Sequence, residues 1–180
     1  MAEFYLDIET YSPNERPDPS KDKIITVQFQ RLSTRDGKPE GNLEILTEWD
    51  CGSEKEMLER FRRLFITESD FDFIPVGMNL YGFDLIAILS RLNYYFNLNL
   101  GMDFYRNRPV IDIKPTLVMM NGGKFMGYQN LLGKTVSGSM IKTWYEAKDY
   151  PKIIDYIKQE TENFVNKYQL LKSEITKIKL

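Results

Sequence analysis

The sequence predicts an α/β protein with a mixed five-stranded sheet flanked by helices, folded as a single domain over residues 1–180. Two observations indicate this class. Runs with β-character come first as a strand and a hairpin, and strands then alternate with stretches of helical spacing. In addition, 42% of the 180 residues are hydrophobic, which suffices for one sizeable core.

The first strand is predicted at residues 4–10. Its apolar positions, such as Leu6 and Ile8, suit a central strand that is buried on both faces. Asp7 and Glu9 are two positions apart, so on a strand their carboxylates point to the same side. Two like charges on one face repel each other, and a divalent cation removes the conflict. We therefore predict a metal site here. The alternative is that Asp7 and Glu9 simply face solvent on an edge strand.

A hairpin of two further strands is predicted after an irregular loop at residues 11–22, which is rich in Pro, Asn, Asp and Ser. Residues 23–32 alternate polar and apolar side chains, and residues 42–49 resume this β-character. Residues 34–41 lie between them and contain the Gly and Pro of a turn. These segments give the second and third strands.

The first helix is predicted at residues 54–67. Ser53 is followed three positions later by Glu56, which is the pattern of a capping box. Apolar residues then recur at helical spacing, namely Met57, Leu58, Phe61, Leu64 and Phe65.

The middle of the chain continues the alternation of strand and helix. Residues 73–78 form a short apolar run that predicts a fourth, buried strand. Residues 82–95 carry apolar side chains at helical spacing, and residues 97–107 are predicted to be a loop. Residues 109–113 predict a short fifth strand.

The last third of the chain contains two predicted breaks and a long helix. The breaks are at residues 121–124 and 136–139, which contain Gly, Asn or Ser. The helix is predicted from about residue 150 to 172, with a buried apolar stripe.

The composition excludes several kinds of catalysis. The chain has no histidine, which removes Ser-His-Asp triads, His-ligated zinc and a histidine general base. Its single cysteine, Cys51, cannot form a disulfide framework or a Cys-rich zinc site. The remaining groups are carboxylates, Tyr, Lys, Ser and one Cys. With carboxylates, the preferred cofactor is an oxygen-bound cation such as Mg²⁺ or Mn²⁺.

Localisation is predicted from what the sequence lacks. It has no run near the roughly 20 apolar residues that span a bilayer and no charged-then-apolar leader. We expect a soluble cytoplasmic protein without a membrane partner. The net charge of −2 neither indicates nor excludes nucleic-acid binding, because an acidic metal site offsets local basic patches.

Three short motifs carry the acidic residues of the chain's candidate site. They are Asp7-Ile8-Glu9, Asn79-Leu80-Tyr81-Gly82-Phe83-Asp84 and Tyr156-Ile157-Lys158-Gln159-Glu160. In this order they resemble the three motifs of the DEDD 3′–5′ exonucleases, which have a ribonuclease H-like fold, with Glu160 where the family has Asp. The likeness is to the tyrosine subclass, and particularly to stand-alone relatives of the exonuclease domains of family B DNA polymerases.

The resemblance implies two-metal hydrolysis of phosphodiester bonds from the 3′ end of single-stranded DNA, with RNA as an alternative substrate. Proteins of DNA repair or replication are candidate partners. In this reading two Mg²⁺ or Mn²⁺ ions are held by Asp7, Glu9, Asp84 and Glu160. Tyr156 positions the attacking water, and Thr10, Asn79 and Phe83 bind the 3′ end.

Three alternatives stay open at this point. Asp155 is a second candidate for the fourth ligand, although Tyr156 and Glu160 fit the helical register better. The departure at Glu160 also allows a catalytically weakened module that binds nucleic acid or a partner. Finally, scattered cations are either solubility charges or a phosphate groove with Tyr128 or Phe125 for base stacking: Arg106, Arg108, Lys124, Lys134 and Lys142.

Overall fold

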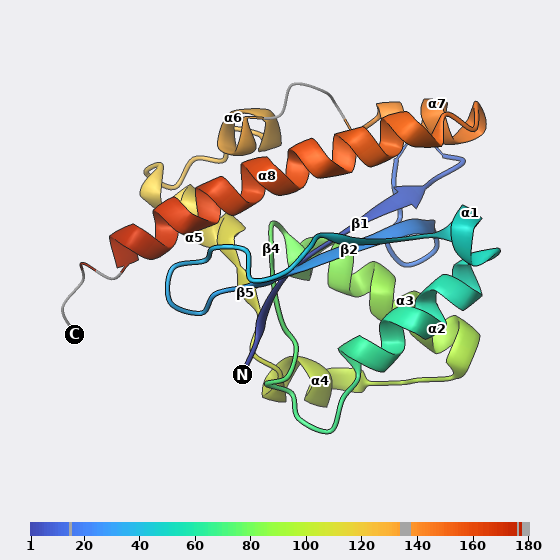
Figure 1. The fold of residues 1–180 in the computed structure, drawn as a ribbon, viewed down its shortest axis with the longest axis horizontal. Coiled ribbons are helices and arrows are strands. Elements are labelled where there is room, and N and C mark those ends of the chain that lie inside the picture. The colour runs from blue at the N-terminus through green and yellow to red at the C-terminus, as the bar shows by residue number, and fades with distance from the viewer. Residues whose placement is uncertain (15, 134–137, 176, 178–180) are drawn as a thin grey trace.

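A computed structural model describes residues 1–14, 16–133, 138–175 and 177. Its centre is a five-stranded sheet with the strand order β3-β2-β1-β4-β5. The strands are β1 (Glu3–Tyr11), β2 (Lys23–Leu32), β3 (Glu44–Thr47), β4 (Ile74–Gly77) and β5 (Ile111–Asp112). β1 pairs antiparallel with β2 and parallel with β4, so the sheet is mixed (Figure 1). The predicted fold class is confirmed.

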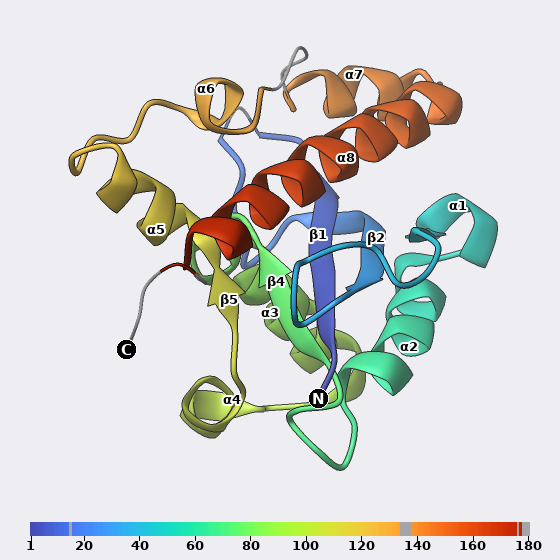
Figure 2. The ribbon, with the colours of Figure 1, turned by 60° about the vertical axis from the view of Figure 1, so that its left-hand side comes forward.

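Helices cover both faces of the sheet, as the two views of the ribbon show (Figures 1 and 2). On one side lie α2 (Glu54–Phe65) and α3 (Asp84–Phe96). On the other side the long helix α8 (Tyr150–Ile175) crosses the sheet. The remaining helices are α1 (Glu48–Cys51), α4 (Gly101–Asn107), α5 (Ile113–Met120), α6 (Tyr128–Leu132) and α7 (Met140–Glu146), with a 3-10 turn, η1 (Leu80–Gly82), before α3.

The alternation of β1 assigns its side chains to the two layers. Leu6 and Ile8 belong to the core beneath α2 and α3. Tyr5 belongs to the core beneath α5 and α8, where it packs on Phe164 with 4.9 Å between ring centroids. Because Asp7 and Glu9 have the same parity as Tyr5, they are directed toward the α8 side.

Local sequence signals placed several elements correctly. The side chain of Ser53 accepts a hydrogen bond from the backbone N–H of Glu56, so the predicted N-cap of α2 is present. The second strand has the predicted bounds, and the long helix α8 ends three residues beyond its predicted end. The predicted break at residues 136–139 falls partly outside the described residues.

Three of the predicted segments show the largest differences from the structure. The third strand stops at Thr47, because the side chain of Thr47 caps α1 by accepting from the N–H of Asp50. Residues 97–107 are not all loop, since α4 forms there and buries Phe104 against Phe65. The fifth strand has only two residues, because Asp112 caps α5 and accepts from the N–H of Lys114.

No helix in the described part of the chain is both long and apolar enough to cross a membrane.

An ion pair with a buried carboxylate joins the two helices on the α2 side of the sheet. The Glu54 carboxylate receives two hydrogen bonds from the Arg91 guanidinium, at 2.8 and 2.6 Å, and one from the Tyr95 hydroxyl at 2.9 Å. It also accepts the backbone N–H of Ile24 on β2 at 2.8 Å. Glu54 is only 2% exposed, so it links α2, α3 and the sheet within the core.

Replacing Glu54 by Ala is expected to lower the free energy of unfolding by about 3 kcal/mol, because it leaves a partly buried guanidinium and a buried N–H without their acceptor. Urea denaturation measures this. Glu59→Ala on the same helix is the matched control, since Glu59 pairs with Arg62 and Arg63 at the surface and is expected to contribute less than about 1 kcal/mol. Equal losses in the two variants would contradict this role for Glu54.

Candidate active site

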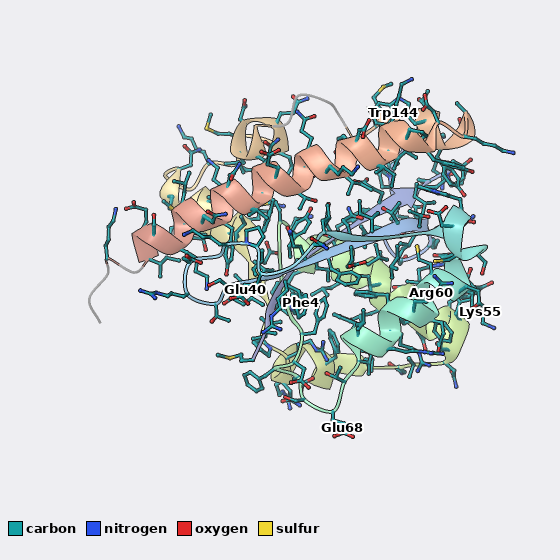
Figure 3. All side chains as sticks on the ribbon, viewed as in Figure 1. Phe4, Glu40, Lys55, Arg60, Glu68 and Trp144 are labelled. Atoms are coloured by element: carbon teal, nitrogen blue, oxygen red, sulfur yellow. The ribbon has the colours of Figure 1, made fainter. Side chains whose placement is uncertain are left out.

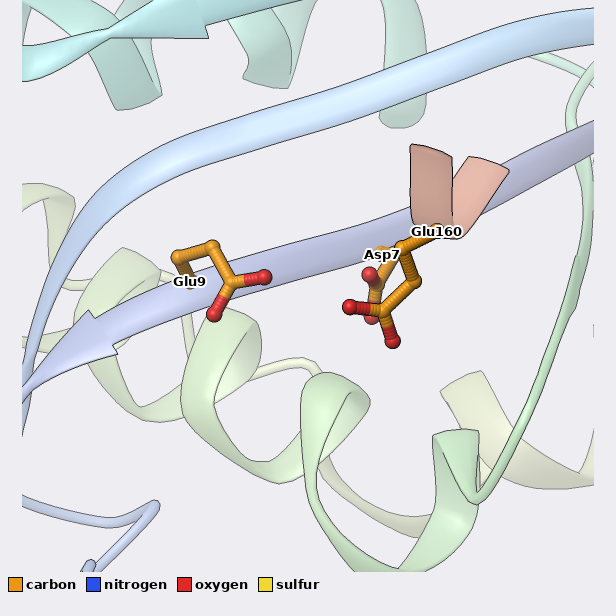
Figure 4. Close-up of side chains that lie close together, drawn as sticks. All are labelled: Asp7, Glu9 and Glu160. Carbon is orange, nitrogen blue, oxygen red and sulfur yellow. The ribbon is translucent and has the colours of Figure 1, made fainter. Parts of the chain in front are cut away.

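Three carboxylates converge between β1 and α8. Asp7 and Glu9 come from the strand, and Glu160 reaches down to it from the helix (Figure 4). One oxygen of each lies within 4.8 Å of the others. Glu160 is 8% exposed, so this cluster combines proximity of like charges with partial burial. Both raise the electrostatic energy of the site unless a cation is bound.

Asp7 is oriented by polar neighbours on the same face of the sheet. Its Oδ2 accepts from the Tyr5 hydroxyl at 3.2 Å and from Gln28 Nε2 at 3.1 Å. Gln28 is fully buried, lies opposite Asp7 in the β1–β2 register and accepts in turn from the Thr26 hydroxyl at 3.0 Å. Sequence reasoning missed Gln28. The alternating polar residues at positions 26 and 28 of a buried strand were the available signal.

Asp84 approaches the same region from the N-terminus of α3. It is 4% exposed, and its Oδ1 accepts the backbone N–H of Ile8 at 3.3 Å. Burial, and next the neighbouring Asp7 carboxylate, raise the pKa of Asp84 well above its ordinary value. The structure thus sets Asp84 beside Asp7 in an environment that favours either a proton or a cation on the pair.

The third motif lies on α8, with Tyr156 and Glu160 one turn apart. Both are 8% exposed and line the same cleft, whereas Asp155 points to solvent. Of the two carboxylates considered for the fourth position, the structure brings Glu160 to Asp7 and Glu9.

The Tyr156 hydroxyl is held in its protonated form. Burial raises its pKa well above the ordinary value, and the negative charges of Glu9 and then Asp7 raise it further. Its ring packs edge-on against Trp144 of α7, with 6.1 Å between centroids. Near neutral pH this group can donate a hydrogen bond into the cleft but cannot act as a general base.

Asn79 follows β4 and has a left-handed backbone, with φ of 69°. Asp112 holds it there, because one carboxylate oxygen accepts the N–H of Asn79 at 2.8 Å and the other accepts the N–H of Tyr81 at 3.2 Å. A Cβ at Gly82 would lie only 2.4 Å from Asn79 Oδ1, so any larger residue there would displace the Asn79 side chain. Asp112, which the sequence analysis did not assign to the site, therefore shapes the second motif.

The carboxylates open into one cleft with a volume of about 240 Å³. Of the sequence-predicted 3′-end residues, Asn79 and Phe83 line it. Thr10 is not among its described lining residues, because alternation along β1 directs it to the face opposite Asp7 and Glu9. The lining consists of Tyr5, Asp7, Ile8, Glu9, Met78, Asn79, Phe83, Asp84, Tyr128, Leu132, Gly138, Tyr156, Glu160 and Phe164.

The cations considered for a phosphate groove lie in different surroundings in the part of the chain that the structure describes. Arg108 is buried, donates to the carbonyl of Phe65 at 2.7 Å and stacks on the rings of Phe65 and Phe104, so its role is structural. Lys142 donates to the carbonyl of Pro13 at 2.9 Å. Lys124 and Arg106 are exposed, and Lys134 lies outside the described residues.

The donor set fits a hard divalent cation. Asp7, Glu9 and Glu160 supply only carboxylate oxygens, and Asp84 adds another beside Asp7. The chain has no histidine, and Cys51 belongs to the core under α2 and α3. Oxygen-only donors of this kind favour Mg²⁺ or Mn²⁺ over zinc or copper.

Together, the fold and the site define a ribonuclease H-like α/β protein with an acidic cleft at the central strand. Comparison with solved structures agrees with this class. An inhibitor complex of exonuclease I aligns with a TM-score of 0.50 and 14% identity, over 67% of this chain and 29% of that one. Escherichia coli exonuclease I in complex with a dT13 oligonucleotide aligns with a TM-score of 0.50 and 14% identity, over 76% and 31%.

The present chain therefore shares the fold of the matched part of exonuclease I and spans about three tenths of the length of those chains. No protein-family model matches the sequence, and no curated protein matches it either.

Proposed function

We propose that this chain is a metal-dependent 3′–5′ exonuclease that hydrolyses phosphodiester bonds in single-stranded DNA, as a DEDD-type enzyme of the tyrosine subclass. The observation that carries the proposal is the convergence of Asp7, Glu9 and Glu160 within 4.8 Å in a cleft. Asp84 completes a set of four carboxylates there. One exonuclease domain then covers residues 1–180.

Asp7 and Asp84 would hold one Mg²⁺ or Mn²⁺ ion, and Asp7, Glu9 and Glu160 would hold a second. Paired ions in such sites lower the pKa of the attacking water and neutralise charge on the phosphate and the leaving oxygen. The chain's own contribution is to fix the carboxylates. Tyr5 and Gln28 do this for Asp7, and the N–H of Ile8 does it for Asp84.

Tyr156 orients the attacking water by donating a hydrogen bond, because its hydroxyl keeps its proton near neutral pH. Asn79 and Phe83 also line the cleft and bind the terminal nucleotide, the first by hydrogen bonding and the second by ring contact. Support for a single-stranded DNA substrate comes from exonuclease I, which shares the fold and has been captured with a dT13 oligonucleotide.

A time course with one oligonucleotide sequence, as DNA and as RNA, tests the proposal. With a 5′ label and Mg²⁺ or Mn²⁺, we expect a ladder that shortens from the 3′ end, faster on DNA, and no cleavage in EDTA. A 3′-labelled strand is the matched control and should release labelled mononucleotide at once.

Asp7→Asn, purified in the same way, should not cleave the strand, and this result would exclude a contaminating nuclease. If the wild-type protein binds the strand but leaves it intact with either metal, the proposed enzymatic function is overturned. The fold would then serve as a nucleic-acid-binding module, the alternative raised by Glu in place of Asp at position 160.

A further inference from the structure

Lys114 lies beside the cleft, and neither the motifs nor the proposed chemistry uses it. It is the second residue of α5, directly after the end of β5. Its ammonium donates to Asn79 Oδ1 at 2.7 Å and to the Tyr128 hydroxyl at 3.2 Å. The ring of Phe125 lies 5.0 Å from this nitrogen, and the ring of Tyr128 lies 5.5 Å from it. Lys114 is therefore fixed between an amide and two aromatic rings.

The charge of Lys114 faces neutral groups. Among the described residues, no carboxylate forms an ion pair with it within 4.0 Å. Asp112, two residues earlier, directs its oxygens to the backbone N–H groups of Asn79, Tyr81 and Lys114. A half-buried ammonium that faces an amide oxygen and ring faces lacks a full counter-charge. An anionic ligand in the cleft would supply it.

Lys114 also determines how Asn79 meets that ligand. An ammonium only donates hydrogen bonds, so it must face the oxygen of the Asn79 side chain rather than the nitrogen. The NH₂ group then lies at the other end of the amide. Because Asn79 lines the cleft, this leaves two donors for acceptor oxygens of a bound strand.

We infer that Lys114 is a substrate-binding residue, whose ammonium pairs with a backbone phosphate of the bound single strand and whose hydrogen bond sets the Asn79 amide. This inference rests on the proposed function for the class of ligand. The rings of Phe125 and Tyr128, together with the hydrogen bonds to Asn79 and the Tyr128 hydroxyl, hold the ammonium in place before the strand arrives. Tyr128 lines the cleft as well, which makes the cation continuous with the site.

The test is binding of a 5′-fluorescein oligo-dT strand, followed by anisotropy in EDTA at several salt concentrations. Lys114→Gln is expected to weaken binding roughly tenfold. It should also lower the slope of log affinity against log salt by about 0.7, the value for one phosphate contact on a single strand. Lys114→Arg keeps the charge and should restore the slope.

Lys55→Gln is the control, since Lys55 is an exposed residue of α2, in the layer away from α8 (Figure 3). The affinity of Lys55→Gln and its salt slope should equal those of the wild type. Thermal unfolding of each variant identifies any loss of folded protein. A slope for Lys114→Gln equal to that of Lys55→Gln would overturn the phosphate contact.

The coupling to Asn79 is tested by a double-mutant cycle in the same binding assay. If Lys114 sets the Asn79 amide, Lys114→Gln should weaken binding less in an Asn79→Ala background than in the wild type. Strictly additive effects would overturn the positioning role.

Because binding is measured without metal, these results are independent of cleavage. If the salt slope differs between Lys114→Gln and Lys55→Gln but the wild type never cleaves, the proposed enzymatic function is overturned and the inferred role of Lys114 stands. If the wild type cleaves but the two variants have the same salt slope, the proposed enzymatic function stands and the inferred role of Lys114 is overturned. Wild-type protein that neither binds nor cleaves would overturn both.

Discussion

Asp7→Asn is expected to lower the rate of metal-dependent cleavage by about 10³-fold or more. Asp7 lies at the centre of the four carboxylates, since it belongs to the cluster with Glu9 and Glu160 and also adjoins Asp84. Losing its charge weakens both proposed ion positions. A loss of several kcal/mol of stabilisation is ordinary for such a site, and about 4 kcal/mol corresponds to that factor. Single-turnover rates with saturating protein and Mg²⁺ measure it.

The same substitution should stabilise the metal-free protein. Asn retains an oxygen that can accept from Tyr5 or Gln28, while the repulsion with the neighbouring carboxylates disappears. We expect a gain of about 1 kcal/mol, or roughly 2–4 °C in the unfolding temperature in EDTA. Asp72→Asn, at an exposed position before β4, is the control and should change neither quantity. A less stable Asp7→Asn protein would mean that its lost activity reflects misfolding.

The parts of the fold that follow from local spacing could be predicted from the sequence. Alternation in β1, the Ser53 cap and the apolar stripe of α8 are all determined by residues a few positions apart. In contrast, α4 was missed because its sequence has Gly and Asn at the ends and gains its stability from Phe104 packing on Phe65. Contacts of that range leave no periodic signal.

The same distinction applies to the site. The pair on β1 was visible because strand geometry alone puts positions 7 and 9 on one face. Supporting residues such as Gln28, Asp112 and Lys114 act across strands or loops that are distant in sequence, so their roles depend on register and topology. Arg108 shows the opposite error, since a cation counted for a groove is enclosed by aromatic rings instead.

Helix phase determines what to expect of Glu160 and its neighbour. Positions 156 and 160 are one turn apart and face the cleft, whereas Asp155 is turned about 100° away from Tyr156 and is exposed. Glu160→Gln should therefore reduce single-turnover cleavage by about 10²-fold, the scale of losing one aligned charged group in such a site. Asp155→Asn on the same helix should leave cleavage within about twofold of the wild type.

Glu160→Asp tests whether the longer side chain is the adapted one. The backbone of α8 is fixed by the packing of Ile157 and Phe164, which are almost completely buried, so the helix cannot move to compensate for a shorter side chain. The carboxylate would withdraw from Asp7 and Glu9 by about 1.5 Å, the length of one carbon–carbon bond. Displacements of this size lower rates by roughly 10²-fold, and the variant should recover partly with Mn²⁺, whose geometry is less strict than that of Mg²⁺. Faster cleavage by Glu160→Asp than by the wild type would instead mean that Glu160 weakens a site whose geometry favours the shorter acid.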